Sequence, residues 1–251
     1  MILKEKNGLH WLEFELFAPF PQLIHGIFLR QGGVSLEPFA SLNFSQFVGD
    51  SDEAVAANES LAAKALNLPK IARTWLYHGT DICIATHQNY RTALKGDALI
   101  TKENDLALLM THADCQTAIF FDPTQSLLAL AHSGWRGSVQ NIYGHLIRNL
   151  QSEHGCQPEN IFAAIGPSLG PDSAEFINYR TELPEAFWDF RFGNCHFDFW
   201  AISEWQLTAA GILPHHLQIA KIDTFADEVN YFSYRRDKIC GRNGTFAMLG
   251  S

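Results

Sequence analysis

Apolar and polar positions alternate with helical spacing in several long segments of the chain. In the segment 138–150 the apolar residues recur at spacings of three and four, which predicts a helix with one apolar stripe. The segment 50–69 predicts a second helix, with Asp50 or Ser51 as its N-cap and Pro69 beyond its end. A further helix is expected over 198–211, from Asp198 as N-cap to Gly211 as its stop.

Short apolar runs bounded by turn-forming residues predict strands elsewhere. Continuous apolar runs at 96–101 and 106–110 indicate buried strands, and 161–171 indicates a strand that is stopped by Gly and Pro. Shorter strands are expected within 10–30 and on both sides of a turn in 73–87. Because strands and helices are interspersed without a repeat or a linker, we expect one domain over 1–251. Its expected class is mixed α/β (α+β), with mixed β-sheets flanked by helices.

Composition narrows the class of protein. Of the 251 residues, 47% are hydrophobic and 18% charged, which is typical of a folded globular chain. The formal net charge is −9 and no run is rich in Lys or Arg, which argues against a nucleic acid or an anionic membrane as partner. The N-terminal segment contains acidic residues where a signal peptide needs an apolar core, and the five cysteines are scattered without a CxxC pair. These features predict a cytoplasmic protein with reduced thiols.

Two β-prone runs, 115–121 and 126–132, flank a group of turn formers and predict a hairpin. If Pro123 and Thr124 are its two loop residues, Cys115 lies directly opposite His132, with Cβ atoms roughly 4.5–5.5 Å apart. Pro-Thr is not a primed-turn sequence, and a bulge that shifts the pairing by one residue would place the two side chains on opposite faces.

A neighbouring Cys and His allow two kinds of chemistry. In one, Cys115 is a nucleophile that His132 activates. In the other, both side chains bind zinc or copper, together with a third ligand from elsewhere in the chain. The best candidate for that ligand is His78, because Gly79 follows it and would let a ligand approach closely. Three protein ligands leave one open position, as in a catalytic metal site.

Residues near this pair are candidates for the remaining roles. Arg136 and the helix start at 138 would suit an anion such as phosphate, and His112 or Asp114 could transfer protons. Other polar residues have structural alternatives: Arg30 and Asn43 could simply close turns, and the Arg235-Arg236 pair could be a solvated face or pair with Asp237. The candidates for substrate binding are therefore Arg30, Asn43, Arg136, Arg235 and Arg236.

The motifs "THADC", "LALAHSGWRG", "AIGPSLGP" and "YFSYRRD" with a following "CGR" occur in this order, after "HGIFLRQGGVS" and "SLNFSQFVGD". Together they resemble the YfiH-type, laccase-domain family, also described as multi-activity purine nucleoside phosphorylases. The resemblance covers the chain from about residue 23 to its end. It implies a single mixed α/β domain and a metal site formed by His78, Cys115 and His132.

The resemblance also implies activities. They are phosphorolysis of adenosine, inosine, guanosine and methylthioadenosine, and hydrolytic deamination of adenosine. Older descriptions of the family are copper-dependent polyphenol oxidation, and a role in editing peptidoglycan precursors has also been attributed to it. The leading prediction is a zinc-dependent purine nucleoside phosphorylase with adenosine deaminase activity, acting on small nucleosides and phosphate as a monomer or dimer. The alternatives are a laccase-like copper enzyme, a Cys/His amidase-type hydrolase and a non-enzymatic binding protein.

The chain departs from the family pattern at several positions. His112 stands where the family usually has Thr, Leu76 where it has Gln, and Asp223 where a Cys is common. The Leu76 change would alter contacts with the substrate, and the Asp223 change removes a second cysteine. None of these departures affects the three proposed ligands.

Overall fold

Two mixed β-sheets form the centre of the protein in a computed structural model that describes residues 1–92 and 94–251. The first sheet has the order β1-β2-β3-β15-β8-β4-β6 and the second the order β14-β11-β9-β10-β7-β5. A two-stranded ribbon, β12-β13, lies apart from them. The strands of the first sheet, in sheet order, are Ile2–Lys6, Leu9–Glu13, Leu23–Phe28, Asn243–Leu249, Ala107–His112, Ile71–Trp75 and Leu94–Lys95. Those of the second sheet are Leu217–Ile219, Phe162–Ile165, Gln116–Asp122, Leu127–Ser133, Ala98–Thr101 and Ile82–Ile84, and those of the ribbon are Arg191–Phe192 and His196–Phe197.

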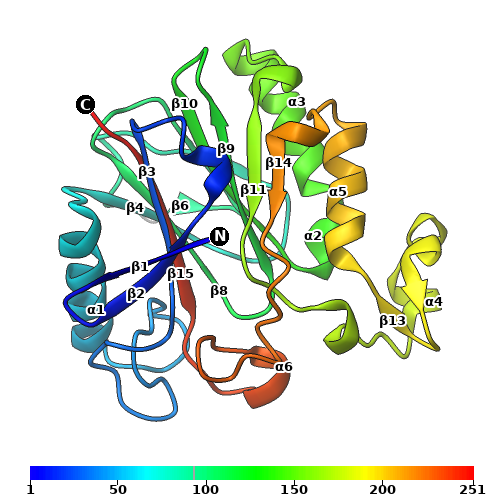
Figure 1. The fold of residues 1–251 in the computed structure, drawn as a ribbon, viewed down its shortest axis with the longest axis horizontal. Helices are drawn as coiled ribbons and strands as arrows, with labels where there is room; N and C mark the ends of the chain where they lie inside the picture. The colour runs from blue at the N-terminus through cyan, green and yellow to red at the C-terminus, as the bar shows by residue number, and fades with distance from the viewer. Residues whose placement is uncertain (93) are drawn as a thin grey trace.

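The helices cover the outer faces of the two sheets (Figure 1). Helix α1 packs on the first sheet through Ala62 and Leu66, and helices α3 and α5 pack on the second through residues that include Leu146 and Leu207. Between the sheets lies a third apolar layer, with Phe121 from one sheet and Met110 from the other. The α-helices are α1 (Asp52–Leu66), α2 (Trp135–Val139), α3 (Ile142–His154), α4 (Tyr179–Glu182), α5 (Phe199–Ala209) and α6 (Tyr234–Asp237). Short 3-10 helices span Glu15–Phe17, Pro158–Asn160, Pro171–Ser173, Glu185–Phe190 and Pro214–His216. The expected mixed α/β class is confirmed.

Local capping explains where two predicted helices begin. The Ser51 hydroxyl accepts a hydrogen bond from the Ala54 N–H at 3.1 Å, and the Asp198 carboxylate accepts one from the Ala201 N–H at 2.9 Å. Each cap satisfies a backbone donor that the first helical turn leaves free. Both predicted helices are confirmed, with Ser51 rather than Asp50 as the N-cap.

The predicted helix over 138–150 is wrong at its start. Helix α2 ends at Val139, and Asn141 has a left-handed conformation with φ of 54°. The Asn141 side chain then accepts a hydrogen bond from the Gly144 N–H at 3.0 Å and caps α3. Asn tolerates this backbone conformation and is a strong N-cap, so it divides the segment although the apolar spacing continues across it.

The hairpin of β9 and β10 has a longer loop than predicted. Leu127 lies opposite Asp122 and His132 lies opposite Thr117, so the loop is 123–126 and the expected pairing of Cys115 with His132 is wrong. The Asp122 carboxylate accepts hydrogen bonds from the backbone N–H groups of Thr124 and Gln125 within the loop and stabilises it. Because side chains alternate with a period of two, a two-position shift keeps the same faces. Cys115 therefore remains near His132, immediately before the start of β9.

A small lobe projects beside α5 at the edge of the molecule (Figure 1). It contains α4, β12 and β13, and its core is aromatic, with Phe176, Tyr179 and Phe197 buried together. Trp135 and Phe199 pack against that core from the main body. In the part of the chain that the structure describes, no helix is both long and apolar enough to cross a membrane.

Candidate metal centre and its two cavities

His78, Cys115 and His132 converge from three separate loops and strand ends. One potential ligand atom from each of them lies within 4.8 Å of the other two. The Cys115 Sγ is 3.9 Å from the His78 Nε2, and the two imidazole rings are 5.0 Å apart with an interplanar angle of 76°. His78 follows β4, Cys115 precedes β9, and His132 lies near the end of β10.

Asp97, which immediately precedes β7, orders two of these three residues. One of its carboxylate oxygens lies 3.0 Å from the His132 Nδ1, which must donate the hydrogen bond because the carboxylate can only accept. The carboxylate also accepts the backbone N–H groups of His78 at 3.0 Å and Gly79 at 2.8 Å. These bonds hold His78 in a left-handed conformation with φ of 65°. The proton on Nδ1 leaves the Nε2 lone pair of His132 free to bind a metal.

Gly134 lets the three residues come together. A Cβ atom at this position would lie 2.9 Å from the Cys115 Sγ and 2.9 Å from the His78 Cδ2. Only glycine leaves that space open without a shift of neighbouring atoms. Two imidazoles and a thiol are nitrogen and sulfur donors that suit zinc or copper, so the residues fit a metal ion.

The charges within the triad are coupled. Burial alone would raise the pKa of Cys115, but His132 and His78 lower it to about 6. Burial alone would lower the pKa of His132, but Cys115 and Asp97 raise it to about 9. Without a metal, the group therefore favours a thiolate beside an imidazolium. A cation bound there would take the place of that proton.

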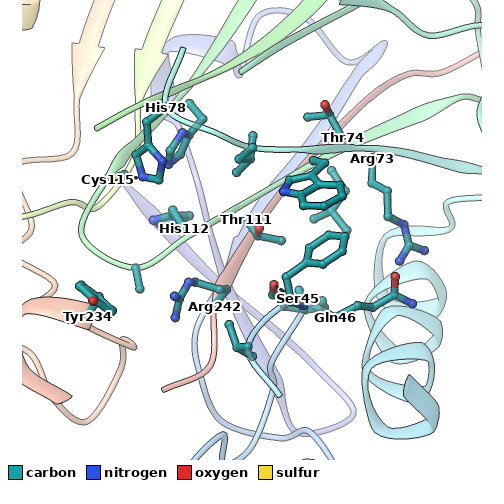
Figure 2. A pocket seen from close by; sticks show the side chains of 18 of the residues that line it. Ser45, Gln46, Arg73, Thr74, His78, Thr111, His112, Cys115, Tyr234 and Arg242 are labelled. Carbon is teal, nitrogen blue, oxygen red and sulfur yellow. Dashed lines mark hydrogen bonds between the residues drawn. The ribbon is translucent and has the colours of Figure 1, made fainter. Parts of the chain in front are cut away.

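A cavity of about 410 Å³ opens on one side of the triad (Figure 2). Figure 2 shows His78 and Cys115 at one end of this cavity and Arg73 with Thr74 at the other. Phe47 and Trp75 line it as a stacked pair, with ring centroids 5.2 Å apart and an interplanar angle of 16°. Outside the triad, the charged side chains among the described lining residues are all arginines, namely Arg73, Arg136 and Arg242. We call this the aromatic cavity.

A second cavity of about 360 Å³ opens on the other side of the same residues. It shares His78, Cys115 and Arg136 with the aromatic cavity. Its further cationic side chains are Arg235 and Lys238, so we call it the cationic cavity. Cations lie over three of its aromatic rings: the Arg136 guanidinium is 4.3 Å from the Trp135 ring, that of Arg235 is 5.8 Å from the Phe176 ring, and the Lys238 Nζ is 5.3 Å from the Tyr234 ring.

The two acid/base candidates occupy different surroundings. His112 is the last residue of β8, and both of its buried ring nitrogens lack a hydrogen-bond partner within the described chain. Burial lowers the pKa of His112 to about 3, so its imidazole is neutral at neutral pH. The Asp114 carboxylate accepts hydrogen bonds from the Thr224 hydroxyl at 2.8 Å and the Arg235 N–H at 2.6 Å. His112 lines the aromatic cavity and Asp114 the cationic one.

Among the predicted substrate-binding residues, Arg136 and Arg235 lie beside the triad. Arg30, Asn43 and Arg236 do not line either cavity. The Arg30 guanidinium donates to the Ala40 carbonyl, Asn43 bonds to Ser45 and Asp50, and Arg236 donates to the carbonyls of Thr224, Phe225 and Tyr231. These contacts stabilise loops.

The predicted helix start at 138 is wrong as well. Helix α2 begins at Trp135, with Gly134 as N-cap, and ends five residues long at Val139. Arg136 itself borders both cavities.

Several residues of the site were missed in the sequence. Asp97 was visible only as the polar residue before the buried strand "ALIT", and Arg242 only as part of "CGR". Phe47 and Trp75 lie far apart in sequence, and no periodic pattern connects them. Their signal is the exposure of large aromatic side chains, which only the folded chain displays.

Comparison with solved structures and curated relatives agrees with this fold. The crystal structure of YlmD from Geobacillus stearothermophilus has a TM-score of 0.88 and 31% identity, covering 99% of this chain and 98% of that one. The crystal structure of Bacillus licheniformis hypothetical protein YfiH also has a TM-score of 0.88, with 26% identity and 98% of each chain covered.

Curated relatives are similar over most of their length. The "Purine nucleoside phosphorylase YlmD" of Geobacillus stearothermophilus is 34% identical over 241 residues, covering 88% of this chain and 87% of the relative. The "Purine nucleoside phosphorylase YfiH" of Escherichia coli is 30% identical over 233 residues, covering 88% and 91%. The family model described as "Multi-copper polyphenol oxidoreductase laccase" matches residues 24–250. The chain therefore belongs to this laccase-like family, whose curated members YfiH and YlmD are named purine nucleoside phosphorylases.

Proposed function

We propose that this protein is a cytoplasmic, zinc-dependent purine nucleoside phosphorylase that also deaminates adenosine. Its substrates would be adenosine, inosine, guanosine and methylthioadenosine, with phosphate. The observation that carries the proposal is the group of His78, Cys115 and His132 between two cavities. Three ligands that face open space leave a coordination position for chemistry. The names of the relatives supply the reaction class.

In this proposal His78, Cys115 and His132 hold the zinc ion. A zinc ion bound there would supply positive charge and lower the pKa of a water molecule to about 7. Asp97 acts behind these residues, because its carboxylate keeps the proton of His132 on Nδ1 and holds the backbone of His78. Hydrogen bonds of this kind orient metal ligands and strengthen binding.

Phosphorolysis forms a bond between a phosphate oxygen and C1′ of the ribose, while the bond from C1′ to the purine nitrogen breaks. The transition state resembles an oxocarbenium ion, as in glycoside hydrolysis. Arg136 borders both cavities and would hold the phosphate. The departing purine needs a proton, and His112 is better suited than Asp114 to guide it. The Asp114 oxygens are occupied by hydrogen bonds, whereas the ring nitrogens of His112 have none among the described residues.

Deamination would use the same site with water in place of phosphate. Water adds its oxygen to C6 of adenosine and ammonia leaves, which produces inosine. The two reactions compete, so phosphate concentration should decide the ratio of adenine to inosine. That dependence separates a shared site from a contaminating deaminase.

The test is to strip the purified protein of metal, reload it with zinc and incubate it with adenosine, with and without phosphate. Chromatography should show adenine and ribose 1-phosphate when phosphate is present, and inosine without it. Cys115→Ser should lose both activities while its circular dichroism stays unchanged. If neither adenine nor inosine forms with zinc bound, the proposal fails. Stoichiometric copper in the isolated protein, with oxidation of a phenol, would favour the polyphenol oxidase instead.

A further inference from the structure

The two cavities beside the triad differ in what they can bind. In the cationic cavity the aromatic rings are already in contact with other side chains: Arg136 lies over Trp135, Arg235 over Phe176 and Lys238 over Tyr234. The fourth ring, Phe199, packs against Phe176 with centroids 5.2 Å apart. In the aromatic cavity, Phe47 and Trp75 stack only on each other, and no cation lies over either ring among the described residues. The aromatic cavity therefore has the free π-surface.

Exposure of this pair points to a ligand. The exposed fraction is 65% for Phe47 and 54% for Trp75, although both are large apolar side chains. Covering such surface is favourable, and a flat aromatic ligand gains both burial and stacking. A purine base has the required shape and π-face. Thr74 and Thr111 line the same cavity (Figure 2), but the Thr74 hydroxyl already donates to the Gly96 carbonyl at 2.9 Å. The hydroxyl of Thr111 is neutral and suits a ribose.

Free cationic donors favour the opposite cavity for phosphate. Each cavity has three cationic side chains, but in the aromatic cavity Arg73 pairs with Glu59, and the Arg242 guanidinium donates to the carbonyls of Cys240 and Gly241. Arg136, Arg235 and Lys238 line the cationic cavity against one carboxylate, Asp114, which is already hydrogen-bonded to Thr224 and to the Arg235 backbone. Within the described residues the guanidinium of Arg235 donates one hydrogen bond, to the Glu175 carbonyl at 3.0 Å, and so retains further N–H donors. A dianion gains most where several such donors converge.

Resting on the proposed function, we propose that the two substrates bind on opposite sides of the metal triad. The purine nucleoside occupies the aromatic cavity with its base stacked on the Phe47–Trp75 pair. Phosphate enters through the cationic cavity, held by Arg235 and Lys238. The reacting atoms then meet at the triad, where Arg136 borders both sides. Phe47 and Trp75 are thus specificity-determining residues for the base.

The test measures the two substrates separately on zinc-loaded protein. Adenosine and free adenine are titrated calorimetrically without phosphate, and KM for phosphate is measured at saturating adenosine. Trp75→Ala should weaken adenosine and adenine by about 10- to 100-fold, the usual loss when one stacking contact is removed. Its KM for phosphate should change less than about twofold. Arg235→Ala and Lys238→Ala should show the reverse pattern, with KM for phosphate raised about tenfold.

A matched control is Trp205→Ala. Trp205 is also an exposed tryptophan, at 45%, but it packs against Phe187 and Phe190 of the lobe, away from both cavities. Its removal should leave both measurements unchanged. If the wild type binds adenosine and Trp75→Ala binds it equally well, the assignment of the base is wrong. If Arg235→Ala weakens adenosine instead of phosphate, the two sides are reversed and the proposal is overturned. Failure of the zinc-loaded wild type to bind adenosine would overturn the proposed function as well.

Discussion

Gly134 provides the sharpest test of the metal centre, because a single methyl group added there should weaken metal binding while the protein still folds. Its φ of −79° and ψ of 178° are accessible to any residue, so Gly134→Ala introduces no backbone strain. The added Cβ would lie 2.9 Å from both the Cys115 Sγ and the His78 Cδ2, whereas ordinary contact begins at 3.4 Å. One or both ligands must therefore move by up to 0.5 Å, the difference between these two distances.

That displacement exceeds the tolerance of a metal site. Metal–ligand distances vary by only about 0.2 Å, and disturbance of the groups that support ligands typically lowers affinity by about 10- to 100-fold. We expect a loss of that size in zinc affinity, or about 1.4–2.7 kcal/mol. Competition with a chromophoric chelator measures it, and thermal unfolding of the metal-free protein checks the fold.

Gly137→Ala is the matched control. This glycine lies three residues further along, in α2, and its Cβ would meet no atom closer than the Ser133 Oγ at 3.4 Å. Alanine favours the helix, so the control should fold at least as stably and bind zinc normally. Zinc binding by Gly134→Ala within threefold of the wild type, or an equal loss in Gly137→Ala, would contradict this role of Gly134.

Three further predictions concern Asp97, Cys115 and His25. Asp97→Asn places an amide donor near the backbone N–H groups that the carboxylate accepts, and should lower zinc affinity about 10- to 100-fold in the same titration; unchanged affinity would remove Asp97 from the site. In metal-free protein at pH 7, iodoacetamide should modify Cys115 before the buried Cys156 and Cys240, because its pKa is lowered to about 6 despite burial. One equivalent of zinc should suppress that modification, as measured by peptide mass spectrometry. Equal modification of Cys115 with and without zinc would contradict its role as a ligand. Burial lowers the pKa of His25 from 6.5 to about 4, and its Nε2 accepts a hydrogen bond from the Phe14 N–H at 2.8 Å. Because the unfolded chain takes up this proton first, stability should fall by about 3 kcal/mol as pH drops from 7 to 4. Over the same pH range, the free energy of unfolding of His25→Gln, measured with denaturant, should fall by about 3 kcal/mol less than that of the wild type. Equal losses in the two proteins would contradict the assignment.

The sequence by itself determined the elements whose causes are local. Helices α1 and α5 were predictable because Ser51 and Asp198 cap them through hydrogen bonds to residues three positions away. The buried strands β7 and β8 were predictable because each is a continuous apolar run. The three candidate ligands were found as well. The proximity of Cys115 to His132 was correctly expected even though the loop length was wrong, because a shift of two positions preserves the face of a strand.

Tertiary structure decided what depends on residues distant in sequence. Asn141 separates α2 from α3, although the apolar spacing in the sequence predicts one continuous helix there. The four-residue loop after Asp122 sets the register of the hairpin. The role of Asp97 exists only because the strand that follows it packs beside His132. The aromatic pair of Phe47 and Trp75 requires a loop and a strand end to meet. Such contacts leave no periodic pattern in the sequence, because the residues around each partner are typical of an ordinary turn, strand end or surface position.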